Sequence, residues 1–143
     1  MPKVLVVDDE KSFAEPAAAE LRHAGFEADV ARTYTEAIER LESSGYDIVS
    51  LDIMMRIERD EKLDPRQAAR AEHGKLTGLL IYDTVHERWP DVNVVVCSVF
   101  GGDEQGREAI RCVQKAGVRI LAKPVTIAEY VSAIRLAAGL SQS

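Results

Sequence analysis

The chain lacks long apolar runs, a surplus of positive charge and more than two cysteines. No apolar stretch approaches the roughly 20 residues of a membrane-spanning helix. The net charge is −6 and no basic stripe stands out, which argues against direct binding of nucleic acid. Met1-Pro2-Lys3 leads straight into an apolar run, so we expect no signal peptide. These absences predict a cytoplasmic domain that contacts neither membrane nor nucleic acid directly.

The two cysteines, Cys97 and Cys112, also lack the spacing of metal ligands. One is expected in a strand and the other in a helix, so we interpret both as reduced packing residues. There is no internal repeat and no low-complexity tract. A length of 143 residues and a hydrophobic content of 46% are ordinary for a single globular domain with a full core.

Short continuous apolar runs alternate with helix-like segments along the chain. Such runs are typical of parallel strands that are buried on both faces. They predict strands at residues 3–7, 27–31, 47–51, 92–97 and 118–122. Strands that alternate with helices imply βαβ units with right-handed crossovers. We therefore predict an α/β fold, namely a flavodoxin-like, doubly wound sheet of five parallel strands in the order 2-1-3-4-5 with helices on both faces.

Three capping boxes mark expected helix starts. In a capping box, a Ser or Thr side chain and a Glu three residues later satisfy free backbone N–H groups of the first turn. The pairs are Ser12 with Glu15, Thr33 with Glu36, and Thr126 with Glu129. Pro16 would then lie in or just after the first turn of its helix, where a missing N–H costs least.

Acidic side chains follow two of the expected strands. Asp8 and Asp9 come directly after the first strand, and Asp52 follows the third. In the predicted order these strands are neighbours at the switch point, where open α/β sheets bind their ligands. Three carboxylates meeting there would repel one another, and Mg²⁺, a hard cation that takes oxygen ligands, would relieve the repulsion.

Two further polar residues lie along the same edge. Ser98 ends the fourth strand, and Lys123 follows the fifth. Any one of these five polar residues alone could equally be a cap of a strand or helix or a functional residue. Their joint placement at the ends of four strands instead favours phosphoryl chemistry.

Four segments resemble the receiver domains of two-component response regulators. They are residues 4–10 (VLVVDDE), 46–55 (YDIVSLDIMM), 95–98 (VVCS) and 116–124 (AGVRILAKP). The segments occur in order and at strand ends, and the resemblance covers the whole chain apart from one insertion.

The resemblance implies a catalytic role for three residues. Asp52 would be the phospho-acceptor, a carboxylate nucleophile that forms an acyl phosphate. Lys123 would neutralise charge on the phosphoryl oxygens, and Ser98 would hydrogen-bond the phosphoryl group once it is attached. The family also implies a cis bond between Lys123 and Pro124.

The resemblance further implies a Mg²⁺ site. Asp9 and Asp52 would hold the ion directly, together with the backbone carbonyl of Met54, and Asp8 would act largely through water. Such a site has few protein carboxylates and several waters, which suits the octahedral preference of Mg²⁺.

Two single residues depart from the family pattern. Val99 stands where the family usually has Ala or Gly, and its branched side chain is expected to narrow access to Asp52, slowing phosphorylation, dephosphorylation or both. Ile120 stands where a switching Tyr or Phe is common. We therefore expect any switching to use a readout other than rotation of an aromatic ring.

The largest departure is an insertion after the third strand. Arg56 replaces the usual proline, and Gly78 matches the glycine that opens the next helix, so residues 56–77 hold roughly eighteen extra residues. Asp64, Pro65 and Gln67 predict a short helix within this segment, ended by Gly74. Three interpretations are open: a solvated excursion without a role, an element that recognises a partner, or a lid that tunes the phosphoryl lifetime.

The resemblance implies a phosphoacceptor receiver that takes phosphate from a sensor histidine kinase or a phosphotransfer protein and signals through contacts with a downstream protein. It would catalyse its own phosphorylation and slow hydrolysis, acting as a switch and not as a turnover enzyme. No output domain follows within these residues, so we expect a stand-alone receiver, although a piece of a longer regulator would look the same.

Two alternatives belong to other classes. A pseudo-receiver would bind proteins without ever using phosphate, but would normally lack one of the acids or the lysine. A Mg²⁺-dependent phosphatase would need a second acid for the leaving group, and Met54 stands where that acid is expected.

Overall fold

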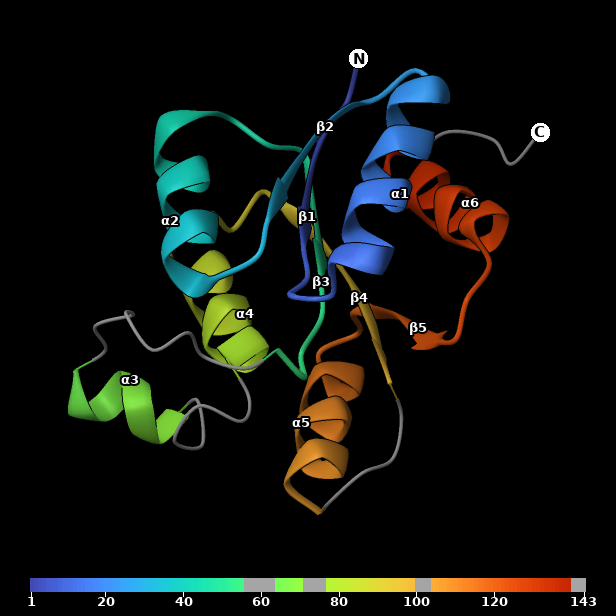
Figure 1. Cartoon of the computed structure of the whole chain (residues 1–143). Coiled ribbons are helices and arrows are strands. Elements are labelled where there is room, and N and C mark those ends of the chain that lie inside the picture. The colour runs from blue at the N-terminus through green and yellow to red at the C-terminus, as the bar shows by residue number, and fades with distance from the viewer. Residues whose placement is uncertain (56–63, 71–76, 100–103, 140–143) are drawn as a thin grey trace.

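The computed structural model describes residues 1–55, 64–70, 77–99 and 104–139. Its strands form one sheet in the order β2-β1-β3-β4-β5, and every pairing is parallel (Figure 1). This confirms the predicted flavodoxin-like order, in which the chain reverses its direction of winding between β1 and β3. Within the described residues, no helix combines the length and the hydropathy needed to cross a bilayer.

The elements follow one another in regular alternation, apart from one extra helix between β3 and β4. The strands are β1 (Lys3–Val7), β2 (Glu27–Ala31), β3 (Ile48–Leu51), β4 (Asn93–Val99) and β5 (Arg119–Lys123). The helices are α1 (Lys11–His23), α2 (Tyr34–Ser43), α3 (Pro65–Arg70), α4 (Thr77–Arg88), α5 (Glu104–Lys115) and α6 (Ile127–Ala137).

Helices cover both faces of the sheet, as Figure 1 shows. α1 and α6 pack on one face, whereas α2, α4 and α5 pack on the other. β1 shows why such a strand is apolar throughout. Val4 and Val6 are buried in the core under α1 and α6, whereas Leu5 and Val7 are buried in the core under α2, α4 and α5. Because successive strand residues point to opposite faces, a strand between two helix layers needs apolar side chains at every position.

The N-cap hydroxyl bonds of two predicted capping boxes are confirmed. The Thr33 hydroxyl accepts a hydrogen bond from the Glu36 backbone N–H at 3.1 Å, and α2 begins directly after Thr33, at Tyr34. The Thr126 hydroxyl accepts from the Glu129 N–H, also at 3.1 Å, at the start of α6. Each bond satisfies a first-turn donor that has no partner within its helix.

The predicted cap at Ser12 is wrong. α1 begins at Lys11 after an extended Glu10, so Ser12 already lies in the first turn, and the Glu10 side chain makes no capping bond. Pro16 is consequently inside the helix. Pro16 has no N–H to donate to the carbonyl of Ser12, but Ser12 is exposed, so water can serve that carbonyl.

β4 extends two residues beyond the prediction, to Val99. β4 extends this far because β5 also continues, to Lys123. Ala122 and Lys123 of β5 pair with Ser98 and Val99 of β4. Ser98 and Lys123 therefore lie within strands and not after them, which fixes their backbones to the sheet.

The two cysteines have different environments. Cys97 is buried in the core under α1 and α6, as expected, but Cys112 is exposed on α5, so its interpretation as a packing residue is wrong. Both thiols are free.

A backbone hydrogen bond joins the residues that flank the insertion. The Thr77 backbone N–H donates to the Met55 carbonyl at 3.0 Å, so the segment leaves and re-enters the domain at adjacent points. Residues 56–63 and 71–76, including the predicted helix end at Gly74, lie outside the described part of the chain.

The predicted helix inside the insertion is present as α3. Its start has reciprocal bonds: the Gln67 N–H donates to Asp64 Oδ1 at 2.8 Å, and the Asp64 N–H donates to Gln67 Oε1 at 3.0 Å. Gln67 Nε2 also donates to the Tyr34 hydroxyl at 3.5 Å, which ties α3 to the start of α2. α3 contacts α4 as well.

Candidate functional site

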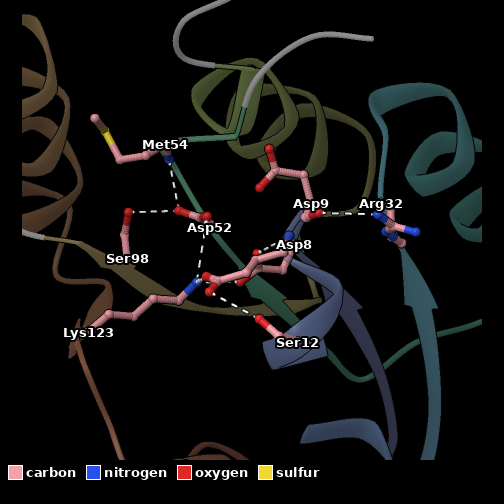
Figure 2. A network of polar contacts seen from close by, with 9 residues as sticks. Asp8, Asp9, Ser12, Arg32, Asp52, Met54, Ser98 and Lys123 are labelled. Atoms are coloured by element: carbon pink, nitrogen blue, oxygen red, sulfur yellow. Dashed lines mark hydrogen bonds and ion pairs between the residues drawn. The ribbon is translucent and has the colours of Figure 1, made fainter. Parts of the chain in front are cut away.

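The three aspartates converge at the carboxyl edge of the sheet, as predicted. β1 and β3 are neighbours, and Asp8, Asp9 and Asp52 follow their last residues. One carboxylate oxygen from each aspartate lies within 4.8 Å of the other two. Asp8 and Asp52 are buried, with 2% and 8% of their surface exposed, and Asp9 is half-buried. Figure 2 shows the cluster together with Ser98 and Lys123.

Asp52 is held by neighbours on both sides. Its Oδ1 accepts hydrogen bonds from the Ser98 hydroxyl at 2.8 Å and from the Met54 backbone N–H at 3.0 Å. Its Oδ2 lies 3.7 Å from the ammonium of Lys123. The carboxylate orientation is therefore set before any ligand arrives.

Lys123 reaches across the edge of the sheet to the residues that follow β1. Its Nζ lies 2.7 Å from Asp8 Oδ2 and 3.4 Å from Glu10 Oε2. The ammonium also lies 4.5 Å from the centre of the Phe13 ring. The lysine side chain is only 9% exposed, so these groups replace most of its hydration.

The buried charges perturb one another. Burial, together with the charge of Asp52, raises the pKa of Asp8 to about 6, against the opposing hydrogen bond from Lys123. Burial likewise raises the pKa of Asp52, although the charge of Lys123 and the Ser98 hydrogen bond oppose the shift. Burial would lower the pKa of Lys123, but its hydrogen bond to Asp8 and the charge of Asp52 outweigh that effect and raise it. The Lys123 ammonium thus compensates the charges of Asp8 and Asp52 only in part.

Gly78 packs directly against the backbone of Asp52. A Cβ at Gly78, in the first turn of α4, would overlap the carbonyl oxygen of Asp52 and lie 2.5 Å from the Cα of Ile53. Only a residue without a side chain lets α4 approach the backbone of the site this closely. The glycine predicted to open this helix therefore also sets the position of Asp52.

Every sequence-predicted side chain is at this edge. Asp8, Asp9, Asp52, Ser98 and Lys123 all come together, and the Lys123-Pro124 bond is cis, as expected. For Met54 the structure records a backbone N–H bond to Asp52, whereas its carbonyl as a metal ligand stays a prediction.

Two departures from the family pattern also lie near the site. Val99 is 55% exposed at the end of β4, and Ile120 packs half-buried against the core. Their expected effects on access to Asp52 and on switching stay predictions.

Two residues near Lys123 received no role from the sequence. Glu10 continues the acidic run of Asp8 and Asp9, so its contiguity was a usable signal. Phe13 carried no such signal, because its contact with Lys123 joins positions far apart in the chain.

The fold and the site together define a class of protein. It is a doubly wound α/β domain whose ligand-binding edge carries three clustered carboxylates, a hydroxyl and a lysine.

Comparison with known proteins agrees with this class. No family model matches the chain. Sensory transduction protein RegX3 of Mycolicibacterium smegmatis is 49% identical over 55 residues, which span 38% of this chain and 24% of that protein. A putative NtrX-like response regulator of Rickettsia conorii is 30% identical over 108 residues, spanning 76% of this chain and 19% of that protein.

Solved structures share the fold over nearly the whole chain. A response regulator receiver domain protein from Clostridium thermocellum has a TM-score of 0.73 and 24% identity, covering 97% of this chain and 95% of that one. Response regulator TrrA from Thermotoga maritima, solved in complex with Mg²⁺-BeF, has a TM-score of 0.69 and 21% identity, covering 96% and 99%. The chain belongs to the receiver domains of two-component response regulators, and it spans about a quarter or less of the curated relatives it matches.

Proposed function

We propose that this receiver domain is a phosphoacceptor in which Asp52 takes a phosphoryl group from a phosphohistidine in a Mg²⁺-dependent reaction. One observation supports this more than any other. The Asp52 carboxylate lies 2.8 Å from the Ser98 hydroxyl and 3.7 Å from the Lys123 ammonium, beside two further carboxylates.

Asp52 would act as the nucleophile. One of its oxygens bonds to phosphorus while the phosphorus–nitrogen bond of the donor breaks, and the electron pair leaves with the donor imidazole, which then takes a proton from solvent. The attacking oxygen must be unprotonated. Burial of Asp52 opposes that state by raising its pKa, and the positive charge of Lys123 favours it.

The donor set fits a hard divalent cation. Asp9, Asp52 and the Met54 carbonyl would hold Mg²⁺, with Asp8 acting through water. When bound, the ion neutralises charge on the transferring phosphoryl oxygens. The clustered carboxylate oxygens support this assignment, since the recorded ion pairs of Asp8 and Asp52 share one ammonium, that of Lys123.

Ser98 and Lys123 would recognise the attached phosphoryl group. Ser98 would move its hydrogen bond from Asp52 to a phosphoryl oxygen, and Lys123 would form an ion pair with another. Because Ser98 lies within β4 and pairs in register with β5, this change would shift the end of β4. That shift is the proposed switch signal.

The partners follow from this chemistry. The phosphoryl donor would be a sensor histidine kinase or a phosphotransfer protein in the cytoplasm, and a downstream protein would read the shifted surface. Slow hydrolysis of the acyl phosphate would reset the switch.

Intact-mass spectrometry after incubation with Mg²⁺ and acetyl phosphate tests the proposal. We expect a labile single-phosphate adduct on the wild type, no adduct on Asp52→Asn, and none on the wild type in EDTA. Asn keeps the size of Asp52 but removes its nucleophilic oxygen, so it is a matched control. A folded, Mg²⁺-loaded wild type that takes no phosphate from acetyl phosphate or a kinase would instead identify a pseudo-receiver.

A further inference from the structure

Lys123 is surrounded by groups of two kinds. Oxygens of three carboxylates lie close to its ammonium nitrogen: Asp8 at 2.7 Å, Glu10 at 3.4 Å and Asp52 at 3.7 Å. The face of the Phe13 ring, 4.5 Å from Nζ, is the other kind of neighbour. The shortest contact therefore draws the ammonium toward Asp8 and away from the acceptor Asp52.

The ring and the carboxylates hold the ammonium in physically different ways. A carboxylate competes for the N–H donors, and its attraction weakens when a cation neutralises it. An aromatic face attracts the ammonium through its quadrupole and accepts no conventional hydrogen bond. The ring therefore retains the side chain without occupying any of the N–H groups, which donate to Asp8 and Glu10 here and would donate to phosphoryl oxygens once the carboxylates are neutralised.

Phe13 is itself held in place by the core. Its ring meets Tyr130 of α6 edge to face, with centroids 5.3 Å apart and an interplanar angle of 85°. Tyr130 is fully buried, so this contact ties Phe13 of α1 to a fixed point beneath the site. Aromatic pairs of this geometry add stability beyond their buried area and favour one ring orientation.

We propose that Phe13 is a positioning residue for the phosphoryl transfer: backed by Tyr130, its ring keeps Lys123 at the site without competing for the N–H groups that would bind phosphoryl oxygens. This inference rests on the proposed phosphoacceptor function. It assigns Phe13 no contact with the phosphoryl group, since the ring acts through Lys123 alone.

Two variants of Phe13 separate positioning from packing. Phe13→Leu keeps an apolar side chain but removes the aromatic face, whereas Phe13→Tyr keeps the face. Phe26→Leu is the matched control, because Phe26 is a buried ring of the same core, 3% exposed, whose recorded cation contact is with Arg135. The rate of phosphorylation by acetyl phosphate is measured by intact mass, and Mg²⁺ affinity by calorimetry.

We expect Phe13→Leu to slow phosphorylation about fivefold, the factor that a partly desolvated cation–π contact supplies. Its Mg²⁺ dissociation constant should stay within about twofold of the wild type, as expected when ring removal leaves the carboxylates in place. Phe13→Tyr and Phe26→Leu should keep the wild-type rate. An unchanged rate in Phe13→Leu, or a parallel loss of rate and Mg²⁺ affinity, would overturn the inference.

A measurement without phosphate distinguishes failure of this inference from failure of the proposed function. The methylene protons next to the Lys123 ammonium should resonate upfield in the wild type because of the Phe13 ring current, and this shift should vanish in Phe13→Leu. Absence of the shift in the wild type contradicts the contact itself. A wild type that shows the shift but takes no phosphate contradicts the proposed function and leaves Phe13 without a reaction to serve.

Discussion

Asp8 is the residue whose environment predicts the clearest pH dependence. Its pKa is raised from an ordinary 3.8 to about 6, first by burial and then by the charge of Asp52. In metal-free protein the folded state therefore holds this proton more tightly than the unfolded chain does. The contribution of Asp8 to stability is full below about pH 4 and is lost as the pH rises through about 6.

We expect metal-free protein in EDTA to lose on the order of 3 kcal/mol of stability from this group between pH 4 and pH 7. Urea unfolding across that range measures the loss. Asp8→Asn cannot titrate, so its curve should be flatter by a similar amount. Parallel curves for the two proteins would show that Asp8 does not carry the shift.

At the scale of single elements, the start of α4 is the point where packing constrains the site. A Cβ at Gly78 would overlap backbone atoms of Asp52 and Ile53, which cannot rotate away. We expect Gly78→Ala to destabilise the protein by about 2–3 kcal/mol and to slow phosphorylation by displacing Asp52. Gly45→Ala is the control, since a Cβ there would meet nothing within 4 Å. Denaturant midpoints that fall equally in both variants would contradict this.

The helix caps allow a second comparison between elements. Thr33→Ala and Thr126→Ala each remove a hydrogen bond to a first-turn N–H and should cost about 1 kcal/mol. Ser12→Ala should cost less than about 0.5 kcal/mol, because Ser12 is exposed and caps nothing. Thermal unfolding of the three variants checks the ranking, and a Ser12 effect as large as the others would show that α1 depends on that hydroxyl.

For the whole molecule, the insertion is the feature that the family resemblance leaves open. Its ends are joined by the bond between the Thr77 N–H and the Met55 carbonyl, so removing the segment requires little rearrangement of the domain. Within the described part of the insertion, the recorded contacts of α3 reach Tyr34 and α4. That the insertion is separable from the chemistry is therefore a prediction, which its deletion would test.

We expect that replacing residues 56–76 with a short Gly-Ser turn leaves folding intact and the rate with acetyl phosphate within about twofold, since loop-closure entropy changes slowly with length. Rates with acetyl phosphate and with several kinases, measured in parallel, separate the three interpretations. A changed kinase preference alone would assign recognition to the insertion, and an altered rate with acetyl phosphate or an altered phosphoryl lifetime would assign it a lid.

Much of the fold and site could be predicted because the relevant signals are local. Continuous apolar runs such as Val4 to Val7 predict strands buried on both faces, and the acids directly after β1 and β3 must meet once those strands are neighbours. The Thr33 and Thr126 caps were predictable for the same reason, since each bond spans three residues. The wrong cap at Ser12 shows the limit, because the observed N-cap residue, Glu10, lies two positions before the Ser that the capping-box spacing indicated.

The sequence by itself therefore determined most helix starts and the identity of the side chains that follow the strands, because neighbouring residues specify these features. The alternation of strands and helices indicated the strand order. Only the tertiary structure decided which groups share Lys123, how close α4 lies to Asp52, and that Tyr130 supports Phe13 beneath the site. Those contacts join residues far apart in the chain, such as Phe13 and Lys123, and their distances depend on how complete helices pack on the sheet.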